Sequence, residues 1–434
     1  MQNLSKFSPL LDTIASMEME VEKPEGLLSG DTLTSAPMEE IDNFSSRYVG
    51  SIALAHGVHD LYAGFLPPLL PILIEKFSLS NFGGGSLTLF FTLPSLLQPV
   101  IGSFADRRNL KILVSLAPLI TGIVMTLLGL TASPVMMMVM LVLAGLSSAS
   151  LHAIGPALNS KHTGKKLGKG MSFWVNAGAL GYALGTLLLV SVYDLVGLSG
   201  LPILVILGAI ASVLIWLGLK GADTSAIASR TQKSAPKDWS RILKIMLPIV
   251  FIIITRAMMT AMLSTYFPAF LRERGASTWV SGAGMTLILI AGVFGSQIVG
   301  NLSDKFSRIK ILAVITIGLF SFMLIFLRTD NWLQIPVLLS MGFLEIAALP
   351  VLMALVQDFF VEDRAFVNDL FLSINFVGTS LSVPLIGRLA DLYNFQTTFQ
   401  LAAYILPFGL LGMAWIYRLT KKQPAGLEPA VRSF

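Results

Sequence analysis

The chain lacks cysteine altogether, so disulfide bonds and thiolate metal sites are excluded. Charge is scarce as well: charged residues make up 13% of the 434 residues, against about 25% in an ordinary soluble protein. The motifs GxxxxGKS/T, HExxH and GxSxG are also missing from the sequence. These absences argue against a set of soluble domains, against ATP-driven transport and against an enzyme, and we expect no cofactor.

A secretory leader is another missing feature. The first 47 residues have neither the basic start nor the apolar core of a signal peptide. They are acidic and contain serine and proline, a composition typical of disordered segments. We expect residues 1–47 to form a disordered cytoplasmic tail, with a regulatory or partner-binding arm as the alternative.

What the chain has instead is long apolar runs, with 54% hydrophobic residues and a mean hydropathy of +0.76. A helix needs about 20 apolar residues to cross a bilayer. Twelve runs qualify: residues 48–74, 84–105, 111–131, 134–157, 170–193, 200–219, 243–271, 280–303, 309–327, 332–357, 366–390 and 397–418. The sequence therefore predicts an all-α membrane protein with twelve transmembrane helices in two pseudo-symmetric six-helix bundles. The expected parts are the tail 1–47, a bundle at 48–219, a cytoplasmic linker at 220–242, a second bundle at 243–420 and a cytoplasmic tail at 421–434.

A repeat supports this duplication. Residues 80–106 align with residues 278–304 at one constant offset and without a gap. The matched pairs are Gly84 with Gly282, Thr88 with Thr286, Leu89 with Leu287, Gly102 with Gly300 and Asp106 with Asp304. Basic residues follow both copies. In transporters built from two such halves, the substrate site lies between them.

Orientation follows from lysine and arginine. Most of the 30 Lys and Arg residues fall in segments that would be inside if the N-terminus is cytoplasmic. This asymmetry satisfies the positive-inside rule. It also accounts for the net charge of +5 without nucleic acid. We expect both termini in the cytoplasm and the lipid bilayer as the surrounding partner.

The repeat ends carry a family resemblance. Gly102-x-x-x-Asp106-Arg107, followed by Lys111, resembles the loop signature of the major facilitator superfamily, and Gly300-x-x-x-Asp304-Lys305 resembles its second copy. Asn109 and Leu110 depart from the family pattern, which has a glycine and an arginine there. The resemblance implies two bundles that rock about a central cavity. It also implies that Asp106 and Asp304 lock the cytoplasmic gate at the starts of the eleventh and fifth helices, where a helix N-terminus favours a carboxylate.

A narrower resemblance rests on three further motifs. These are Ala55-His56-Gly57-Val58-His59-Asp60, Leu97-Gln98-Pro99-Val100-Ile101-Gly102 and Ser147-Ser148-x-x-Leu151-His152. They resemble the fosmidomycin-resistance subfamily of drug exporters, which implies export. Ile154 and Ala157 stand where that subfamily tends to have an acid and an arginine.

Small residues mark the fifth predicted helix. Gly178, Gly181 and Gly185 lie on roughly one face and resemble the glycine-rich motif of proton-coupled exporters, with Thr186 in place of the expected proline. Small faces let helices approach closely. We expect Gly292 and Gly295 in the run 280–303 to form the facing surface across the boundary between the halves.

Ionisable residues inside a membrane are costly and usually functional. Here they are His56, His59, Asp60, His152, Arg256 and Glu345, on the first, fourth, seventh and tenth runs. The resemblance implies that these four helices line the cavity. Asp60, Glu345 and His56 are candidates for proton coupling. Candidate substrate-binding residues are His56, His59, His152, Arg256, Asn176 and Asn375. In the alternatives, Asp60 and Arg256 form a structural ion pair, or His56, His59 and Asp60 bind a divalent metal ion.

We interpret the chain as a proton-coupled secondary transporter of the bacterial inner membrane that exports a small anionic or mixed-polarity organic compound as a monomer. The alternatives are an uptake symporter for an organic anion, a divalent metal-ion carrier, and a non-transporting membrane scaffold or sensor.

Overall fold

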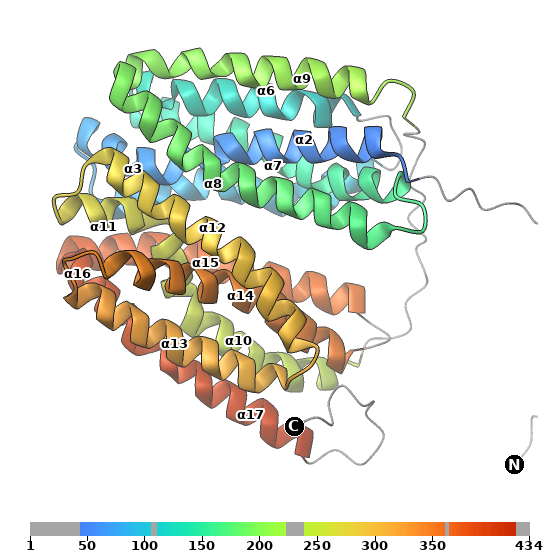
Figure 1. Ribbon diagram of the computed structural model, residues 1–434, viewed down its shortest axis with the longest axis vertical. Helices are drawn as coiled ribbons and strands as arrows, with labels where there is room; N and C mark the ends of the chain where they lie inside the picture. Colours follow the sequence, from blue (N-terminus) through green and yellow to red (C-terminus); the bar gives the residue numbers. More distant parts are fainter. Residues whose placement is uncertain (1–43, 106–110, 223–237, 361–363, 422–434) are drawn as a thin grey trace, which may run out of the picture. The chain divides into compact units, whose positions relative to one another are not determined.

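The computed structural model describes residues 44–105, 111–222, 238–360 and 364–421, and every regular element in these ranges is a helix (Figure 1). Several sequence predictions fall outside these ranges. They concern nearly all of the tail 1–47, most of the linker 220–242, nearly all of the tail 421–434, and the gate residues Asp106 and Arg107.

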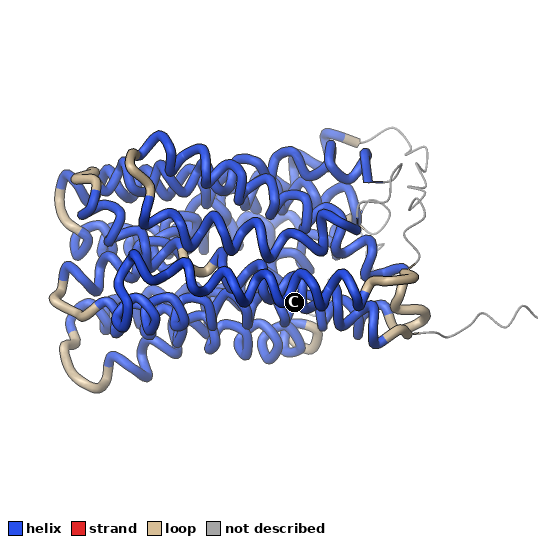
Figure 2. Tube along the Cα trace, turned by 90° about the horizontal axis from the view of Figure 1, so that it is seen from above, coloured by secondary structure: helices blue, strands red, loops and turns tan. Residues whose placement is uncertain are grey.

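The helices run between two ends at which the connecting loops gather (Figure 2). Those of the first half are α2 (Ser46–Ala63), α3 (Leu66–Lys76), α4 (Asn81–Thr92), α5 (Gln98–Ala105), α6 (Lys111–Leu127), α7 (Pro134–Lys161), α8 (Leu167–Gly200) and α9 (Val205–Gly218). Those of the second half are α10 (Trp239–Ala261), α11 (Phe267–Glu273), α12 (Thr278–Ser303), α13 (Arg308–Arg328), α14 (Gln334–Phe359), α15 (Arg364–Leu392), α16 (Phe395–Ile405) and α17 (Gly409–Lys421).

Serine residues determine where several helices begin. The side chain before the first residue of a helix accepts a hydrogen bond from the N–H three positions on at Ser45, Ser80, Ser133, Ser277 and Ser307. Such a cap pairs one of the N–H groups that a helix leaves unpaired at its start. The first helix accordingly begins at Ser46, two residues before the predicted run.

Two predicted spans are joined in one stretch. Eleven stretches of the described residues are long and apolar enough to cross a membrane, and one of them, Leu167–Gly218, has 52 residues. A single helix of that length would measure about 78 Å, more than twice the roughly 30 Å of the hydrocarbon core. Gly197, with φ of 65°, breaks it, and α9 then runs back in the opposite direction to α8 (Figure 1). The stretch is therefore two spans, and the predicted fold of twelve helices in two six-helix bundles is confirmed.

The glycines of α8 lie against α2. A Cβ at Gly181 would overlap the carbonyl group of Gly57, and a Cβ at Gly185 would overlap that of Leu61. The two backbones can come this close only because these positions carry no side chain. This close packing fixes α2, which carries three of the predicted site residues, against α8.

The prediction that Gly292 and Gly295 face the glycines of α8 is wrong. Gly292 and Gly295 of α12 pack against Ile346 and the backbone of Phe343 on α14, within the second half. Each glycine face therefore serves packing inside its own bundle. Sequence spacing identified the small faces but could not say which neighbouring helix each one meets.

The contact between α8 and α12 is polar at its centre. The hydroxyls of Thr186 and Thr286 lie 2.5 Å apart, and the carbonyl oxygen of Ala183 lies within hydrogen-bond distance of both, at 2.8 and 3.1 Å. Both threonines are buried. Thr186, the departure from the expected proline, thus supplies a hydroxyl that joins the two halves.

Candidate functional site

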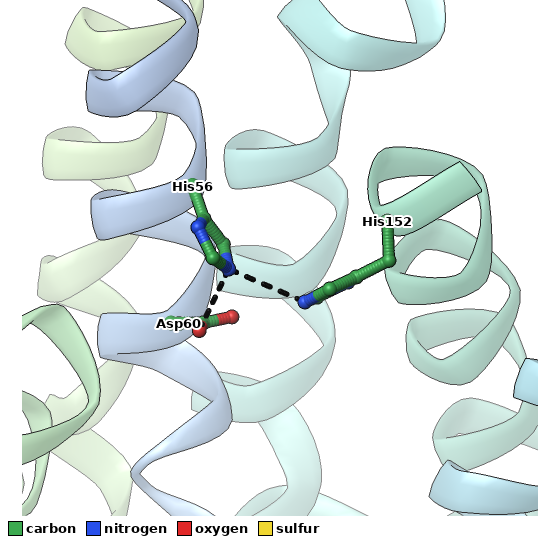
Figure 3. Close-up of side chains that lie close together, drawn as sticks. All are labelled: His56, Asp60 and His152. Carbon is green, nitrogen blue, oxygen red and sulfur yellow. Dashed lines mark hydrogen bonds and ion pairs between the residues drawn. The ribbon is translucent and has the colours of Figure 1, made fainter. Parts of the chain in front are cut away.

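Three of the predicted residues converge inside the first bundle. His56 and Asp60 lie four residues apart on α2, and His152 reaches them from α7 (Figure 3). The Nε2 atom of His56 is 3.1 Å from Oδ2 of Asp60 and 3.3 Å from Nε2 of His152. One ligand-type atom from each residue lies within 4.8 Å of the other two.

Backbone carbonyls fix the tautomers of two of these histidines. Nδ1 of His56 lies 2.9 Å from the carbonyl oxygen of Trp174 on α8, and Nδ1 of His152 lies 2.9 Å from that of Ser148. A carbonyl can only accept, so each Nδ1 must carry the proton and donate it. The indole of Trp174 also stacks on the His56 ring, with the ring centroids 3.8 Å apart. In the neutral form of each ring, Nε2 is therefore an unprotonated acceptor; that of His56 faces Asp60, and that of His152 faces His56.

His59 presents the same kind of lone pair from the other side. Its Nδ1 lies 2.9 Å from the hydroxyl of Thr121 on α6, which itself donates to Ser147 at 3.3 Å. Nδ1 of His59 accordingly donates to Thr121. Nε2 of His59 is buried without a hydrogen-bond partner and lies 3.8 Å from Oδ1 of Asp60.

This arrangement offers a place for one extra proton or another cation. With an ionised Asp60 and three neutral histidines, acceptor atoms would face one another with no hydrogen between them. His56 is buried, whereas Asp60 and His152 are partly buried, and a buried polar group left unpaired carries a desolvation cost. One added proton, on Asp60 or on an Nε2 atom, supplies the missing hydrogen bond. The cluster therefore has the geometry to share one added proton.

The metal-type grouping differs from the predicted one. The sequence suggested His56, His59 and Asp60, whereas the structure groups His56, Asp60 and His152. His59 Nε2 lies 3.8 Å from Oδ1 of Asp60 but does not belong to this three-residue group.

A second polar site lies in the other bundle. Arg256 on α10 pairs with Glu345 on α14, with Nη2 and Oε2 3.0 Å apart, and the same Nη2 bonds the Glu345 carbonyl at 3.2 Å. The hydroxyl of Thr260 donates to Oε1 of Glu345. The structural pair of Arg256 is thus Glu345 and not Asp60. Nη1 of Arg256 is buried and has no hydrogen-bond partner.

The remaining predicted substrate residues are Asn176 and Asn375. Asn176 on α8 accepts a hydrogen bond from Gln297 on α12 at 3.4 Å, across the two halves. Asn375 is half-buried on α15. Asn176 therefore holds helices together in this conformation, and a direct contact of either residue with substrate stays a prediction.

The predicted gate residues that the structure describes are Gly102, Lys111, Gly300, Asp304 and Lys305. A Cβ at Gly102 or Gly300 would meet nothing within 4 Å. Lys111 lies over the ring of Trp216, and Lys305 is exposed. Asp304 pairs with Arg308 on its own half at 3.2 Å, while α8 begins without a side-chain cap. The expected contact of Asp304 with the start of the fifth span is not made in this conformation.

Comparison with known proteins identifies the family of this chain. A family model described as Major Facilitator Superfamily matches residues 52–382 and residues 249–433. The chain belongs to the Major Facilitator Superfamily. It is a multi-pass membrane transporter by this membership, and the two overlapping matches agree with its internal repeat.

Relatives of this superfamily member extend the comparison. The fosmidomycin resistance protein of Escherichia coli (strain K12) is 24% identical over 382 residues, covering 85% of this chain and 92% of the relative. Among solved structures, a bacterial homologue of the human lysosomal transporter Spinster, inward-facing and occupied, aligns with a TM-score of 0.67 at 15% identity, covering 88% of this chain and 99% of that one. The nucleoside transporter NupG aligns with a TM-score of 0.65 at 13% identity, covering 86% and 99%. At these identities the structures show the fold alone.

Three partners of the site were not found from the sequence of this superfamily member. Trp174 acts through its backbone carbonyl and ring face, Thr121 through a hydroxyl on a neighbouring helix, and Thr260 through a bond to Glu345. Thr260 lies one turn from Arg256, which a search for polar neighbours on one helix face could have noticed.

Proposed function

We propose that this protein is a proton-coupled exporter of a small anionic or mixed-polarity organic compound, and that it works by alternating access in a bacterial inner membrane. The observation that supports the proposal is the cluster of His56, Asp60 and His152, in which His56 is buried, the other two are partly buried, and the distances allow one added proton to be shared. Family membership supports transport, and the relative named for fosmidomycin resistance supports export.

The proton is the cation that the cluster fits without rearrangement. The distance of 3.1 Å between His56 and Asp60 and that of 3.3 Å between His56 and His152 are hydrogen-bond distances, so one hydrogen can be shared among them. Histidine changes charge near neutral pH. Of the other groups near Asp60, His59 on α2 adds a further acceptor and Tyr182 on α8 interacts electrostatically with the carboxylate. We infer that a proton taken from outside drives substrate release and that its loss to the cytoplasm readies the protein again.

Arg256 is the residue that we assign to an anionic substrate. Its guanidinium stays charged and offers donors in a fixed fork. One of its nitrogens is engaged by Glu345, whereas Nη1 is buried without a partner. A carboxylate or phosphonate-type oxygen would supply the acceptor that Nη1 lacks. We therefore assign coupling to the first bundle and substrate charge recognition to the second.

The test separates coupling from binding. Purified protein in proteoliposomes is given an imposed pH gradient, with fosmidomycin as the first compound because of the relative's name. Wild type should accumulate it against its gradient. Asp60→Asn should lose this uphill transport but keep exchange of labelled for unlabelled compound, which needs no net proton movement. Asp194→Asn is the matched control, since Asp194 is exposed near the C-terminal end of α8.

Each other outcome overturns a stated part of the proposal. Uphill transport by Asp60→Asn at the wild-type rate removes Asp60 from coupling. Accumulation only in right-side-out vesicles, and not in everted ones, favours an uptake symporter. Zinc ions that bind wild type, but not His152→Ala, and that are themselves transported favour a metal carrier. A protein that transports none of a wide set of organic anions, yet loses a partner when residues 1–45 are deleted, favours a scaffold.

A further inference from the structure

The start of α4 is capped by a residue of the opposite half. The backbone N–H groups of Asn81 and Phe82 donate to the two carboxylate oxygens of Asp391, near the end of α15, at 2.7 and 2.9 Å. The next N–H, that of Gly83, donates to Ser80 at 3.0 Å. Three of the N–H groups that a helix leaves unpaired at its start are thus paired, two of them by the partner bundle.

The physical basis of this contact is a charge at a helix end. The first turn of a helix carries a partial positive charge, and a carboxylate there is stabilising. Hydrogen bonds to an ionised acceptor are also stronger than neutral ones. Both oxygens of Asp391 are used, so the contact fixes the direction of approach of α15 as well as its distance.

Further contacts between the halves gather at the same end of the helices, which we call the Asn81 end. Tyr266 lies between α10 and α11, and its hydroxyl donates to the carbonyl oxygen of Asn81 at 2.8 Å. A Cβ at Gly387 would overlap that carbonyl and the Tyr266 hydroxyl, so glycine leaves the room that this approach needs. Arg272 on α11 pairs with Glu75 on α3 at 3.5 Å.

The repeat-related position lacks this carboxylate. At the offset that matches Gly84 with Gly282, Asn81 corresponds to Trp279 at the start of α12. The indole N–H of Trp279 donates to Ser191 of the other half at 3.2 Å, and the N–H of Val280 donates to Ser277 of its own half. Asp194, which lies nearby in sequence, is exposed. The carboxylate cap is therefore a feature of α4 and α15 and is not shared by the pseudo-symmetric pair.

We propose that the bond of Asp391 to the start of α4 is a latch that holds the Asn81 end closed and must break each time that end opens. It goes beyond the proposed transport function, because it needs neither a proton nor a particular substrate. It also pairs with the sequence prediction for Asp106, which lies outside the described residues.

The experiment measures opening directly and without substrate. Spin labels are placed at Leu195→Cys in the first half and Trp332→Cys in the second, both exposed and both at the Asn81 end, on a chain with no native cysteine. Pulsed electron paramagnetic resonance then gives the distribution of distances between them. Because Asp391 is exposed, Asp391→Asn and Asp391→Ala should raise the ratio of open to closed protein by about two- to fivefold. Asp391→Glu should restore most of the closed population.

Controls keep the test decisive. Asp194→Asn should leave the distribution unchanged, and Tyr266→Phe should open the Asn81 end less than Asp391→Ala does. A monodisperse elution profile and an unchanged thermal midpoint establish that each variant is folded. Identical distributions for wild type, Asp391→Asn and Asp391→Ala, or an equal shift in Asp194→Asn, would overturn the latch. Because no transport is measured, such a result leaves the proposed function untouched.

Discussion

At the scale of single residues, hydrogen atoms decide what the site can do. The three histidines look alike in the sequence, yet each is turned by a different neighbour, namely Trp174, Ser148 or Thr121. Nε2 of His56 and Nε2 of His59 face the carboxylate of Asp60, and Nε2 of His152 faces that of His56. The orientation of these rings is therefore set by backbone carbonyls and a hydroxyl that carry no charge themselves.

Gly178 is the residue that makes room for His56. A Cβ there would overlap the imidazole ring. We expect Gly178→Ala to push the ring away from Asp60 and His152 and to abolish uphill transport while the protein still folds. Transport in proteoliposomes and thermal unfolding in detergent check this. Gly168→Ala, at an exposed helical site with nothing within 4 Å, is the control and should transport normally.

Arg256 and Glu345 test the cost of a lone buried charge. Removing one partner of a buried pair costs about 3–5 kcal/mol, whereas removing both is far less costly. We expect Arg256→Met to lower the free energy of unfolding by roughly that amount, and the double variant Arg256→Met with Glu345→Gln to recover most of it. Denaturant unfolding in mild detergent measures both. A double variant less stable than the single one would show that the pair itself is strongly stabilising.

At the scale of helices, the sequence predicts positions along the chain better than positions around an axis. The twelve spans followed from apolar length, because bilayer thickness fixes that length, and the repeat followed from residues that match at one constant offset. His56, Asp60 and His152 were found because ionisable residues are rare in such spans. The pairing of Arg256 with Glu345 and the neighbours of Gly292 were not, because they depend on how each helix is rotated against the next. Asp391 went unrecognised because an acid near a helix end is usually solvated.

Backbone approach makes the α2–α8 contact intolerant of added atoms. A Cβ at Gly185 would overlap the carbonyl of Leu61, which cannot turn away as a side chain can. We expect Gly185→Ala to lower stability by about 1–3 kcal/mol, the usual range for overpacking. Gly50→Ala on α2 has open space around it and should leave stability unchanged or raise it. Thermal midpoints in the same detergent compare the two, and equal midpoints would contradict the packing argument.

At the scale of the whole molecule, the charge asymmetry predicts which end faces outward. Asn331, between α13 and α14, and Lys305, between α12 and α13, lie at opposite ends and are both exposed. In intact bacteria a membrane-impermeant maleimide should label Asn331→Cys but not Lys305→Cys, and everted vesicles should give the reverse. The cysteine-free chain provides a silent background. Labelling of Lys305→Cys in intact cells would invert the assigned topology.

The hydroxyls of Thr186 and Thr286 have a mechanical consequence. They meet where α8 crosses α12, away from the ends of both helices. When two bundles rotate against each other, atoms near the rotation axis move little and atoms far from it move a long way. A hydroxyl can also rotate its hydrogen from one acceptor to another as the angle between the two helices changes. A covalent tether between positions 186 and 286 should therefore still allow the two bundles to rotate and transport to continue. A tether between positions 82 and 391 should prevent that rotation and stop transport.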